Sequence, residues 1–137
     1  MSQSFDVVVI GAGPGGYIAA IRAAQLGLST ACIEGNPYDD PKGEPRLGGT
    51  CLNVGCIPSK ALLHTAEIIN EAKAMAAHGV RFGTPEIDIA AIRANKDDII
   101  GKLTTGLKGL AKQRKVQIVQ GYGRFTSPYS IEVEAAD

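Results

Sequence analysis

The segment Gly11–Gly16 (GAGPGG) constrains the fold of this chain most strongly, because it stands between a strand pattern and a helix pattern. Residues 5–10 (FDVVVI) form a short apolar run, which is typical of a strand buried on both faces of a parallel sheet. Residues 14–27 carry apolar side chains at helical spacing, with a proline at the start and a glycine at the end. A second strand is predicted at 29–34. Together these segments predict the first βαβ unit of a Rossmann-like α/β domain with a parallel sheet.

Three glycines of this segment have roles that suit a residue without a side chain. Gly11 would allow a tight turn, Gly13 would let a pyrophosphate approach the backbone, and Gly16 would let the helix pack close to the strand. The phosphates would lie at the positive end of the helix. Glu34 follows Gly11 by 23 residues, where a carboxylate can accept hydrogen bonds from a ribose diol. The pattern predicts adenine dinucleotide binding; the alternative is a tight turn without a ligand.

The remainder of the chain predicts two further helices and a late β segment. Residues 35–50 are rich in proline and glycine and are expected to form a surface loop. Helices are predicted from Cys51 to about Ala77 and from about Ile89 to Lys112, and short strands at 116–120 and 130–134. The expected apolar face of the first helix is Leu62, Ala66, Ile69, Ala72 and Ala76, and that of the second is Ile92, Ile99, Leu103, Leu107 and Leu110.

The number of strands and the composition limit what this chain can be. A doubly wound nucleotide domain usually has five or six strands, so we expect the domain to be incomplete at Asp137. The 14 basic and 14 acidic residues give a formal net charge of zero, and we expect no nucleic-acid partner. The sequence contains no apolar run long enough for a membrane span and no signal-peptide pattern at its start. We therefore expect a single cytoplasmic domain without a membrane partner.

A second group of reactive residues is the cysteine pair Cys51 and Cys56, in the segment GGTCLNVGCIPSK. In an ideal helix, Cα atoms five positions apart lie about 8.7 Å from each other, whereas a disulfide needs less than about 7 Å. If the two cysteines bond, the first helical turn must be distorted, and Gly55 and Pro58 are the residues that would permit this. A helix N-terminus lowers the pKa of a nearby thiol, which favours a redox dithiol.

Two other interpretations of the cysteine pair stay open at this point. The cysteines could be reduced structural thiols, or they could supply half of a zinc site, for which the candidate partners are Cys32, His64 and His78. Zinc usually takes four ligands at tighter spacing, and we expect no metal site. Cys32 alternates with apolar neighbours and is expected to be a small core residue. Neither histidine has a carboxylate partner at a telling spacing, so we expect both to be solvated or to cap a helix.

The two segments GAGPGGYIAAIRAAQLGL and GGTCLNVGCIPSKALL together resemble the flavoprotein disulfide reductases, which are the class I pyridine nucleotide-disulfide oxidoreductases. Within that family they are most similar to the dihydrolipoamide dehydrogenases, and the resemblance runs from about Asp6 to the end of the chain. The motif ends in Ile57–Lys60 (IPSK), as in the lipoamide enzymes, whereas glutathione reductases usually have an ending similar to Val-Pro-Lys-Lys. The resemblance implies that residues 1–137 are the N-terminal portion of an FAD-binding domain that carries the redox-active disulfide, without the NAD, central and interface domains.

The resemblance assigns the glycine-rich segment to the adenosine and diphosphate parts of FAD. Gly11, Gly13 and Gly16 would hold the diphosphate. Glu34 would bind the adenosine ribose. The backbone of Gly123, in the segment GYGRF, would touch the adenine end of the cofactor.

The resemblance assigns the cysteine segment to the flavin. Gly49, Thr50 and Cys51 would line the path to the flavin, and Lys60 would lie near its N5. Cys51 would be the interchange thiol that attacks the lipoyl disulfide, and Cys56 would contact the flavin. These assignments come from the family and not from the spacing of the residues.

The function implied for the full-length protein is the oxidation of dihydrolipoamide by NAD+, with electrons passing through the cysteine pair and FAD. The implied partners are the lipoyl domains of 2-oxo acid dehydrogenase complexes and a second copy of the protein in a homodimer. Neither His64 nor His78 matches the family's acid/base histidine, and we expect the 137 residues alone to be inactive. The alternatives are a truncated FAD-binding module without catalysis, or another flavin disulfide reductase similar to mercuric or glutathione reductase.

Overall fold

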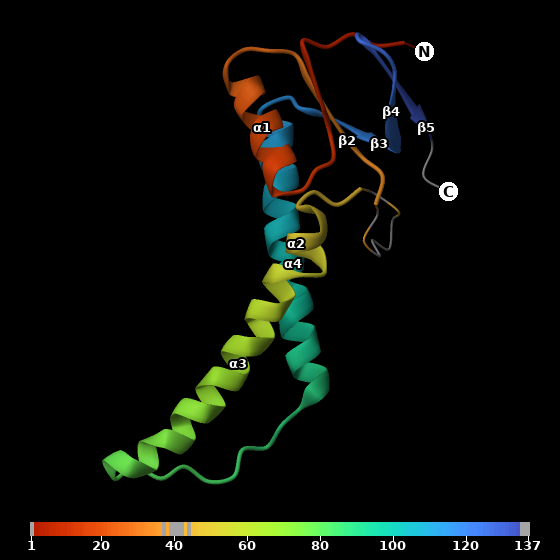
Figure 1. Cartoon of the computed structure of the whole chain (residues 1–137). Helices are drawn as coiled ribbons and strands as arrows, with labels where there is room; N and C mark the ends of the chain where they lie inside the picture. Colours follow the sequence, from red (N-terminus) through yellow and green to blue (C-terminus); the bar gives the residue numbers. More distant parts are fainter. Residues whose placement is uncertain (1, 37, 39–42, 44, 135–137) are drawn as a thin grey trace.

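The chain forms a small α/β unit from which a pair of long helices extends (Figure 1). The computed structural model describes residues 2–36, 38, 43 and 45–134. The elements in chain order are β1 (Val7–Ile10), α1 (Pro14–Gln25), β2 (Thr30–Glu34), α2 (Gly49–Asn53), α3 (Cys56–Ala74), the 3-10 helix η1 (Met75–His78), α4 (Ile89–Gln113), β3 (Gln117–Gln120), β4 (Tyr122–Ser127) and β5 (Ser130–Glu134).

The parallel sheet has three strands in the order β1-β2-β3. Val9 of β1 lies opposite Cys32 of β2, which lies opposite Ile118 of β3. Because α1 connects β1 to β2, these elements form the βαβ unit predicted from the glycine-rich segment. All five residues of β2 are buried, since this strand has a neighbour on each side and packs against α1 and β4. The predicted Rossmann-like α/β class is confirmed.

The first elements are slightly shorter than predicted at their ends. β1 begins at Val7, two residues after the predicted start. α1 ends at Gln25, and Gly27 follows with a φ of +89°, a conformation that ends a right-handed helix. The predicted helix therefore extended two residues too far, into the turn that ends α1.

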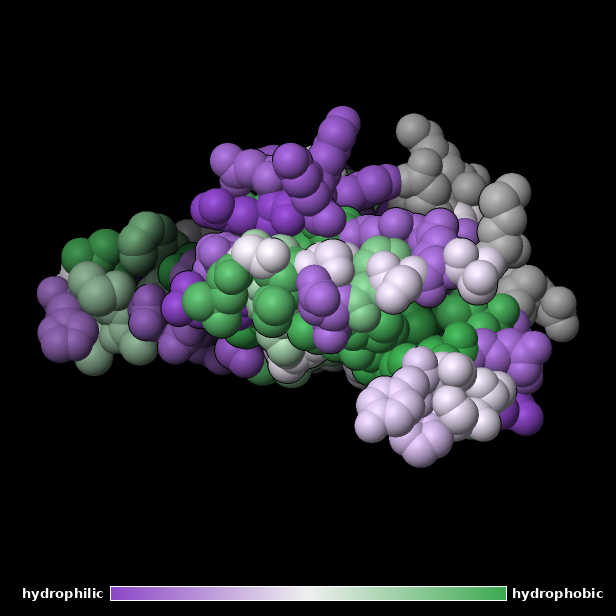
Figure 2. All heavy atoms as spheres, turned by 90° about the horizontal axis from the view of Figure 1, so that it is seen from above, coloured by the Kyte–Doolittle hydropathy of each residue, from purple (hydrophilic) through white to green (hydrophobic). Residues whose placement is uncertain are grey.

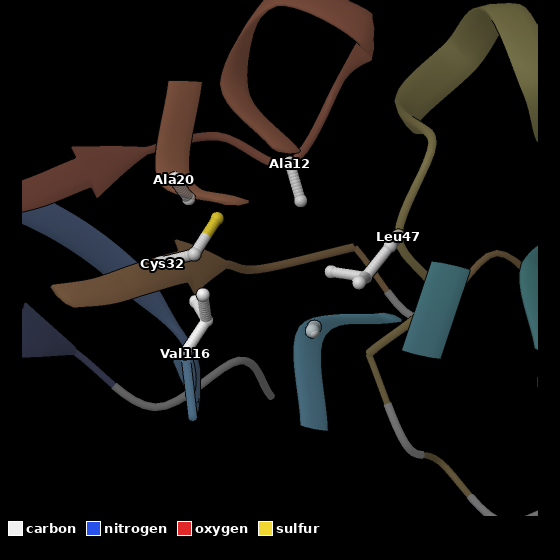
Figure 3. Close-up of a cluster of buried hydrophobic side chains, with 6 residues drawn as sticks. Ala12, Ala20, Cys32, Leu47 and Val116 are labelled. Carbon is white, nitrogen blue, oxygen red and sulfur yellow. The ribbon is translucent and has the colours of Figure 1, made fainter. Parts of the chain in front are cut away.

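The buried core consists mainly of small side chains (Figure 3). Cys32 is 1% exposed, which confirms its prediction as a core residue. Its side chain points into a cluster formed by residues of α1, β2 and α4 and of the segments that precede α1, α2 and β3. Small residues let α1 approach the sheet closely and fix where the glycine-rich turn lies. The cluster is Ala12, Ala20, Cys32, Leu47, Ala111 and Val116.

The predicted face of α4 was correct only in part. Three of its predicted members are half-buried: Ile92, Ile99 and Leu107. The prediction was wrong at Leu103 and Leu110, which are 43% and 46% exposed. Thr104 and Ala111, each one position later, are buried instead. The helix contacts α3, α2, α1 and β3 along its length, and these neighbours decide which positions are covered.

The predicted face of α3 was correct only in part. Ile69 and Ala72 are half-buried, but Leu62, Ala66 and Ala76 are exposed. Leu62 is 42% exposed because the helix turns its neighbour Ala61 inward instead. The row that faces inward is thus displaced by one position in the first half of the helix.

The last part of the chain contains one strand more than predicted. β3 joins the parallel sheet, and β5 matches the predicted strand at 130–134. The segment between them was not predicted to be extended, yet it forms β4, which pairs with β5 in an antiparallel hairpin. Gly121, with a φ of +138°, separates β3 from β4.

The predicted loop at 35–50 lies partly outside the described residues. Gly49 and Thr50 do not belong to a loop, because they form the first turn of α2. In the part of the chain that the structure describes, no helix is both long enough and apolar enough to span a bilayer.

Candidate dinucleotide and redox site

The glycine-rich turn brings the start of α1 against the end of β1. Gly11 has a φ of +91°, and its N–H donates to the carbonyl oxygen of Ile33 at 2.8 Å, which ties the turn to β2. A Cβ atom on Gly16 would lie 1.8 Å from the Gly11 oxygen. The positive φ at Gly11 and the close approach at Gly16 match the roles predicted for these two glycines. A Cβ atom on Gly13 would meet nothing within 4 Å, so this position stays open on the side where a ligand was predicted.

The N-terminus of α1 offers its backbone donors to an anion. No side chain caps the helix, its first turn contains no acidic residue, and Pro14 has no N–H group. The backbone N–H of Tyr17 donates to the carbonyl oxygen of Gly13 at 3.0 Å. The preceding N–H groups and the helix dipole both favour a phosphate at this end.

Glu34 is buried beside the same turn and holds it in place. It is 8% exposed, and its Oε2 accepts from the N–H of Ala12 at 2.9 Å. Its Oε1 accepts from the N–H of Asn36 at 2.9 Å. A carboxylate oxygen has a second lone pair, so these bonds leave room for the predicted contact with a ribose hydroxyl.

Burial, and secondly the charge of Glu34, raise the pKa of the Cys32 thiol to about 11, which keeps that thiol neutral.

Cys51 and Cys56 form a disulfide across a break between two helices. The predicted continuous helix from Cys51 was wrong: α2 ends at Asn53 and α3 begins at Cys56. The chain turns at Gly55, as predicted for a distorted first turn, with φ −113° and ψ −100°. The Cα atoms of the two cysteines are therefore 4.6 Å apart, well below the separation in a continuous helix.

Backbone hydrogen bonds stabilise this break. The carbonyl oxygen of Thr50 accepts from the N–H groups of Val54 at 3.0 Å and Gly55 at 2.7 Å. Pro58 is buried in the first turn of α3, where its missing N–H costs no helical bond. The N–H of Ser59 then donates to the oxygen of Gly55 at 3.1 Å and starts the regular helix.

The structure places the cysteine segment directly against the glycine-rich turn. The N–H of Gly48 donates to the oxygen of Ala12 at 2.7 Å. Gly49 has a φ of +58°, and a Cβ atom there would lie 2.6 Å from the Cα atom of Gly13. The two predicted motifs, 37 positions apart at their first glycines, thus form one continuous site. Sequence reasoning missed Gly48, because the only available signal was a pair of adjacent glycines.

The other predicted site residues lie at the periphery of this site. Thr50 and Lys60 are exposed, Lys60 on α3 one turn after Cys56. Gly123 lies on β4, where a Cβ atom would approach Ile33 Cδ1 to 3.1 Å and Ile10 Cγ1 to 3.3 Å. Close packing of the hairpin on the sheet therefore accounts for a glycine at this position. Its contact with adenine stays a prediction.

The disulfide also bears on the alternatives considered for the cysteines. Cys51 and Cys56 are bonded to each other and are not free thiolate ligands for zinc. Among the described residues, no group of three or more His, Cys, Asp or Glu side chains could hold a metal ion. His64 does have a carboxylate neighbour, contrary to expectation: its Nδ1 lies 3.9 Å from Oε2 of Glu67, with both side chains exposed.

The residues present fit an adenine dinucleotide. The turn is open at Gly13, the start of α1 is uncapped, and the Glu34 carboxylate is bonded to the turn. The disulfide segment is held on the same turn. Backbone donors suited to a phosphate, a carboxylate suited to a ribose and a two-electron redox pair thus belong to neighbouring segments of the chain.

Comparison with known proteins gives a consistent result. The family described as pyridine nucleotide-disulphide oxidoreductase matches residues 5–136. A dihydrolipoyl dehydrogenase from Cupriavidus necator is 61% identical over 126 residues, which are 91% of this chain and 27% of that protein. Dihydrolipoyl dehydrogenase 1, mitochondrial, from Arabidopsis thaliana and a leghemoglobin reductase from Vigna unguiculata are each 53% identical over 137 residues, 99% of this chain and 25% of theirs. The chain spans about a quarter of the length of the curated relatives that it matches.

Proposed function

The chain belongs to the pyridine nucleotide-disulphide oxidoreductase family, and from that premise we propose that it supplies the dithiol and part of the FAD site of a dihydrolipoamide:NAD+ oxidoreductase. The observation that carries the proposal is the Cys51–Cys56 disulfide held against the glycine-rich turn by the bond from Gly48 to Ala12. The identity of 53–61% to proteins named dihydrolipoyl dehydrogenase supports the choice of substrate.

In this proposal, two neighbouring groups of residues hold the cofactor. Gly11, Gly13 and Gly16 bind the diphosphate of FAD through the backbone and the start of α1, and Glu34 binds the ribose. Gly123 contacts the adenine end. When bound, FAD supplies a two-electron acceptor between the dithiol and NAD+.

The second group lies toward the flavin. Gly49 and Thr50 line the approach, and Lys60 provides a cation near the flavin. The position of Gly49 supports this assignment, because this glycine packs directly on Gly13 of the turn and adds no side chain there.

The disulfide takes two electrons and two protons from dihydrolipoamide. One thiolate of the substrate attacks Cys51, so that a mixed disulfide forms and the Cys56 sulfur leaves. The second substrate thiol then attacks the mixed disulfide; the lipoyl sulfur–sulfur bond forms and the Cys51 sulfur is released. Cys56 and Cys51 end as a dithiol that holds the two electrons, for which bound FAD would supply the acceptor. We further propose that the partners are lipoyl domains of 2-oxo acid dehydrogenase complexes and a second copy of the full-length protein.

The test uses the full-length protein with FAD. Dihydrolipoamide is offered as reductant with NAD+, and glutathione disulfide is offered as oxidant with NADH or NADPH; the change in reduced nicotinamide is followed at 340 nm. We expect turnover with dihydrolipoamide and NAD+, and its loss by at least about 10³-fold in Cys51→Ser, because a serine oxygen cannot form the mixed disulfide with the substrate. Activity with the glutathione couple alone would contradict the proposal.

A second measurement asks what residues 1–137 do without further sequence. The purified chain is incubated with FAD and desalted, and its visible spectrum is recorded. Retained flavin bands would show that these residues already hold the cofactor. A colourless chain would leave the family unchanged, but would mean that residues 1–137 do not hold FAD by themselves and have no redox function of their own.

A further inference from the structure

One buried polar side chain beside the disulfide has no part in the assignments above. Asn53 is the last residue of α2, two positions after Cys51 and three before Cys56. It is 6% exposed, although its carboxamide is strongly polar. Burial of such a group is unfavourable unless its donors and acceptor are paired.

Both N–H bonds of the Asn53 amide are used within the cysteine segment. Nδ2 donates to the carbonyl oxygen of Gly49 at 2.9 Å and to that of Leu47 at 3.3 Å. Because both neighbours are carbonyl oxygens, which only accept, the nitrogen must face them. Oδ1 is buried and has no hydrogen-bond partner within the described residues. The side chain therefore carries an unpaired acceptor that an apolar residue of the same size would avoid, and its contribution lies in the two donated bonds.

These two bonds hold together the segment that carries Cys51. Gly49 is the first residue of α2, so the bond to its oxygen lies within that helix, and the bond to Leu47 fastens the end of α2 to the chain before it. Leu47 is 3% exposed and belongs to the core cluster. Contact with the glycine-rich turn is made by Gly49, which packs on Gly13, and by Gly48, which donates to Ala12. The carboxamide of Asn53 thus holds α2 onto the two glycines that contact the turn.

We propose that Asn53 is the positioning residue of the redox pair, because its carboxamide holds α2, and with it Cys51, in register with the glycine-rich turn and with Cys56. This inference rests on the proposed function in one respect, that Cys51 and Cys56 alternate between disulfide and dithiol. In the oxidised state the disulfide itself restrains Cys51. In the dithiol state the Asn53 bonds act together with the backbone bonds around the break, and their loss frees the reduced state more than the oxidised state.

The test is the thiol–disulfide equilibrium of the full-length protein in mixtures of reduced and oxidised dithiothreitol. Two electrons and two protons pass from the dithiothreitol thiols to the disulfide, and dithiothreitol closes to its cyclic disulfide. The sample is quenched in acid and alkylated, and the fraction of dithiol is measured by mass spectrometry. We expect Asn53→Leu to shift the equilibrium toward the dithiol by roughly tenfold, which corresponds to about 30 mV.

Thr104→Val is the matched control. Thr104 is also buried, and its hydroxyl donates to the oxygens of Ile100 at 3.0 Å and Gly101 at 3.1 Å within α4, remote in sequence from the disulfide. We expect this variant to lose stability but to keep the wild-type equilibrium within about twofold. An Asn53→Leu equilibrium equally close to the wild type would overturn the proposal, since a purely structural residue would lower only the stability.

Asn53→Asp decides the question if the leucine variant does not fold. Aspartate has the same size but turns an oxygen toward the two carbonyl groups, so both donated bonds are lost. The expected shift is in the same direction, and an unchanged equilibrium overturns the proposal. The measurement needs neither dihydrolipoamide nor NAD+, so a failure of the proposed substrate leaves it decisive.

Discussion

The glycine-rich turn and the pair of helices α3 and α4 differ in how tightly their residues are packed. At the turn, backbone meets backbone: a Cβ atom on Gly16 or Gly49 would collide with main-chain atoms. Along the helical pair, large apolar side chains such as Leu63, 67% exposed, lie at the surface. Figure 2 shows such hydrophobic surface next to hydrophilic side chains. The turn therefore has one conformation that fits, whereas the helical pair tolerates many residues at its exposed positions.

The largest effect is expected where the turn leaves no space. Gly16→Ala places a methyl group 1.8 Å from the Gly11 oxygen, so the helix or the turn must move. We expect the free energy of unfolding to fall by about 4 kcal/mol or more, which urea denaturation would measure.

Gly15→Ala is the matched control for this variant. A Cβ atom there meets nothing within 4 Å, and the residue lies in the first turn of α1. We expect no loss of stability, or a gain of up to about 1 kcal/mol. Equal losses in both variants would show that the turn is sensitive to any added methyl group and not to this contact.

A smaller effect is expected from removal of a core side chain, and it compares the two regions directly. Leu47→Ala leaves a cavity beside Ala12 and Cys32 and should lower the free energy of unfolding by about 2–3 kcal/mol. Leu63→Ala removes the same atoms from the surface of α3 and should change it by no more than about 0.5 kcal/mol. Similar losses in the two variants would mean that Leu63 is covered in solution.

The turn and the helical pair also differed in how far the sequence predicted them. The βαβ unit and the positions of Gly11, Gly16 and Glu34 followed from local patterns, because steric limits act between residues close to the turn. The face of α4 was wrong at Leu103 and Leu110, because apolar residues occur around much of that helix and its neighbours decide which are buried.

Three features of the site and hairpin had little or no local signal. The break between α2 and α3 was expected only as a distortion at Gly55, since its depth depends on hydrogen bonds to Thr50. Asn53 was not predicted, because an amide in a helical pattern looks like a surface residue. β4 was missed because almost all of its residues are exposed, so its sequence lacks the apolar run of a buried strand.

The smallest effect is expected at the start of the sheet, from a change of pH. Hydrogen bonds from the side chain and then the backbone of Ser29 lower the pKa of Asp6 below its ordinary value. A lowered pKa means that the folded state favours the carboxylate, so this stabilisation is present at neutral pH and is lost as the pH falls below about 4. Asp6→Asn should therefore melt slightly below the wild type at pH 7. Thermal melts of both proteins at pH 7 and pH 3 would check this, and a gap as large at pH 3 as at pH 7 would contradict it.

The order of the strands has a consequence for how this chain is made. Ala31 of β2 pairs with Gln117 of β3, which is synthesised 86 residues later. At about 5–20 residues per second, the ribosome takes roughly 4–17 s to cover that distance. The cysteine segment is complete soon after β2, whereas one edge of β2 lacks its strand throughout this interval. The nascent chain thus acquires its reactive thiols before it can close the sheet that supports them.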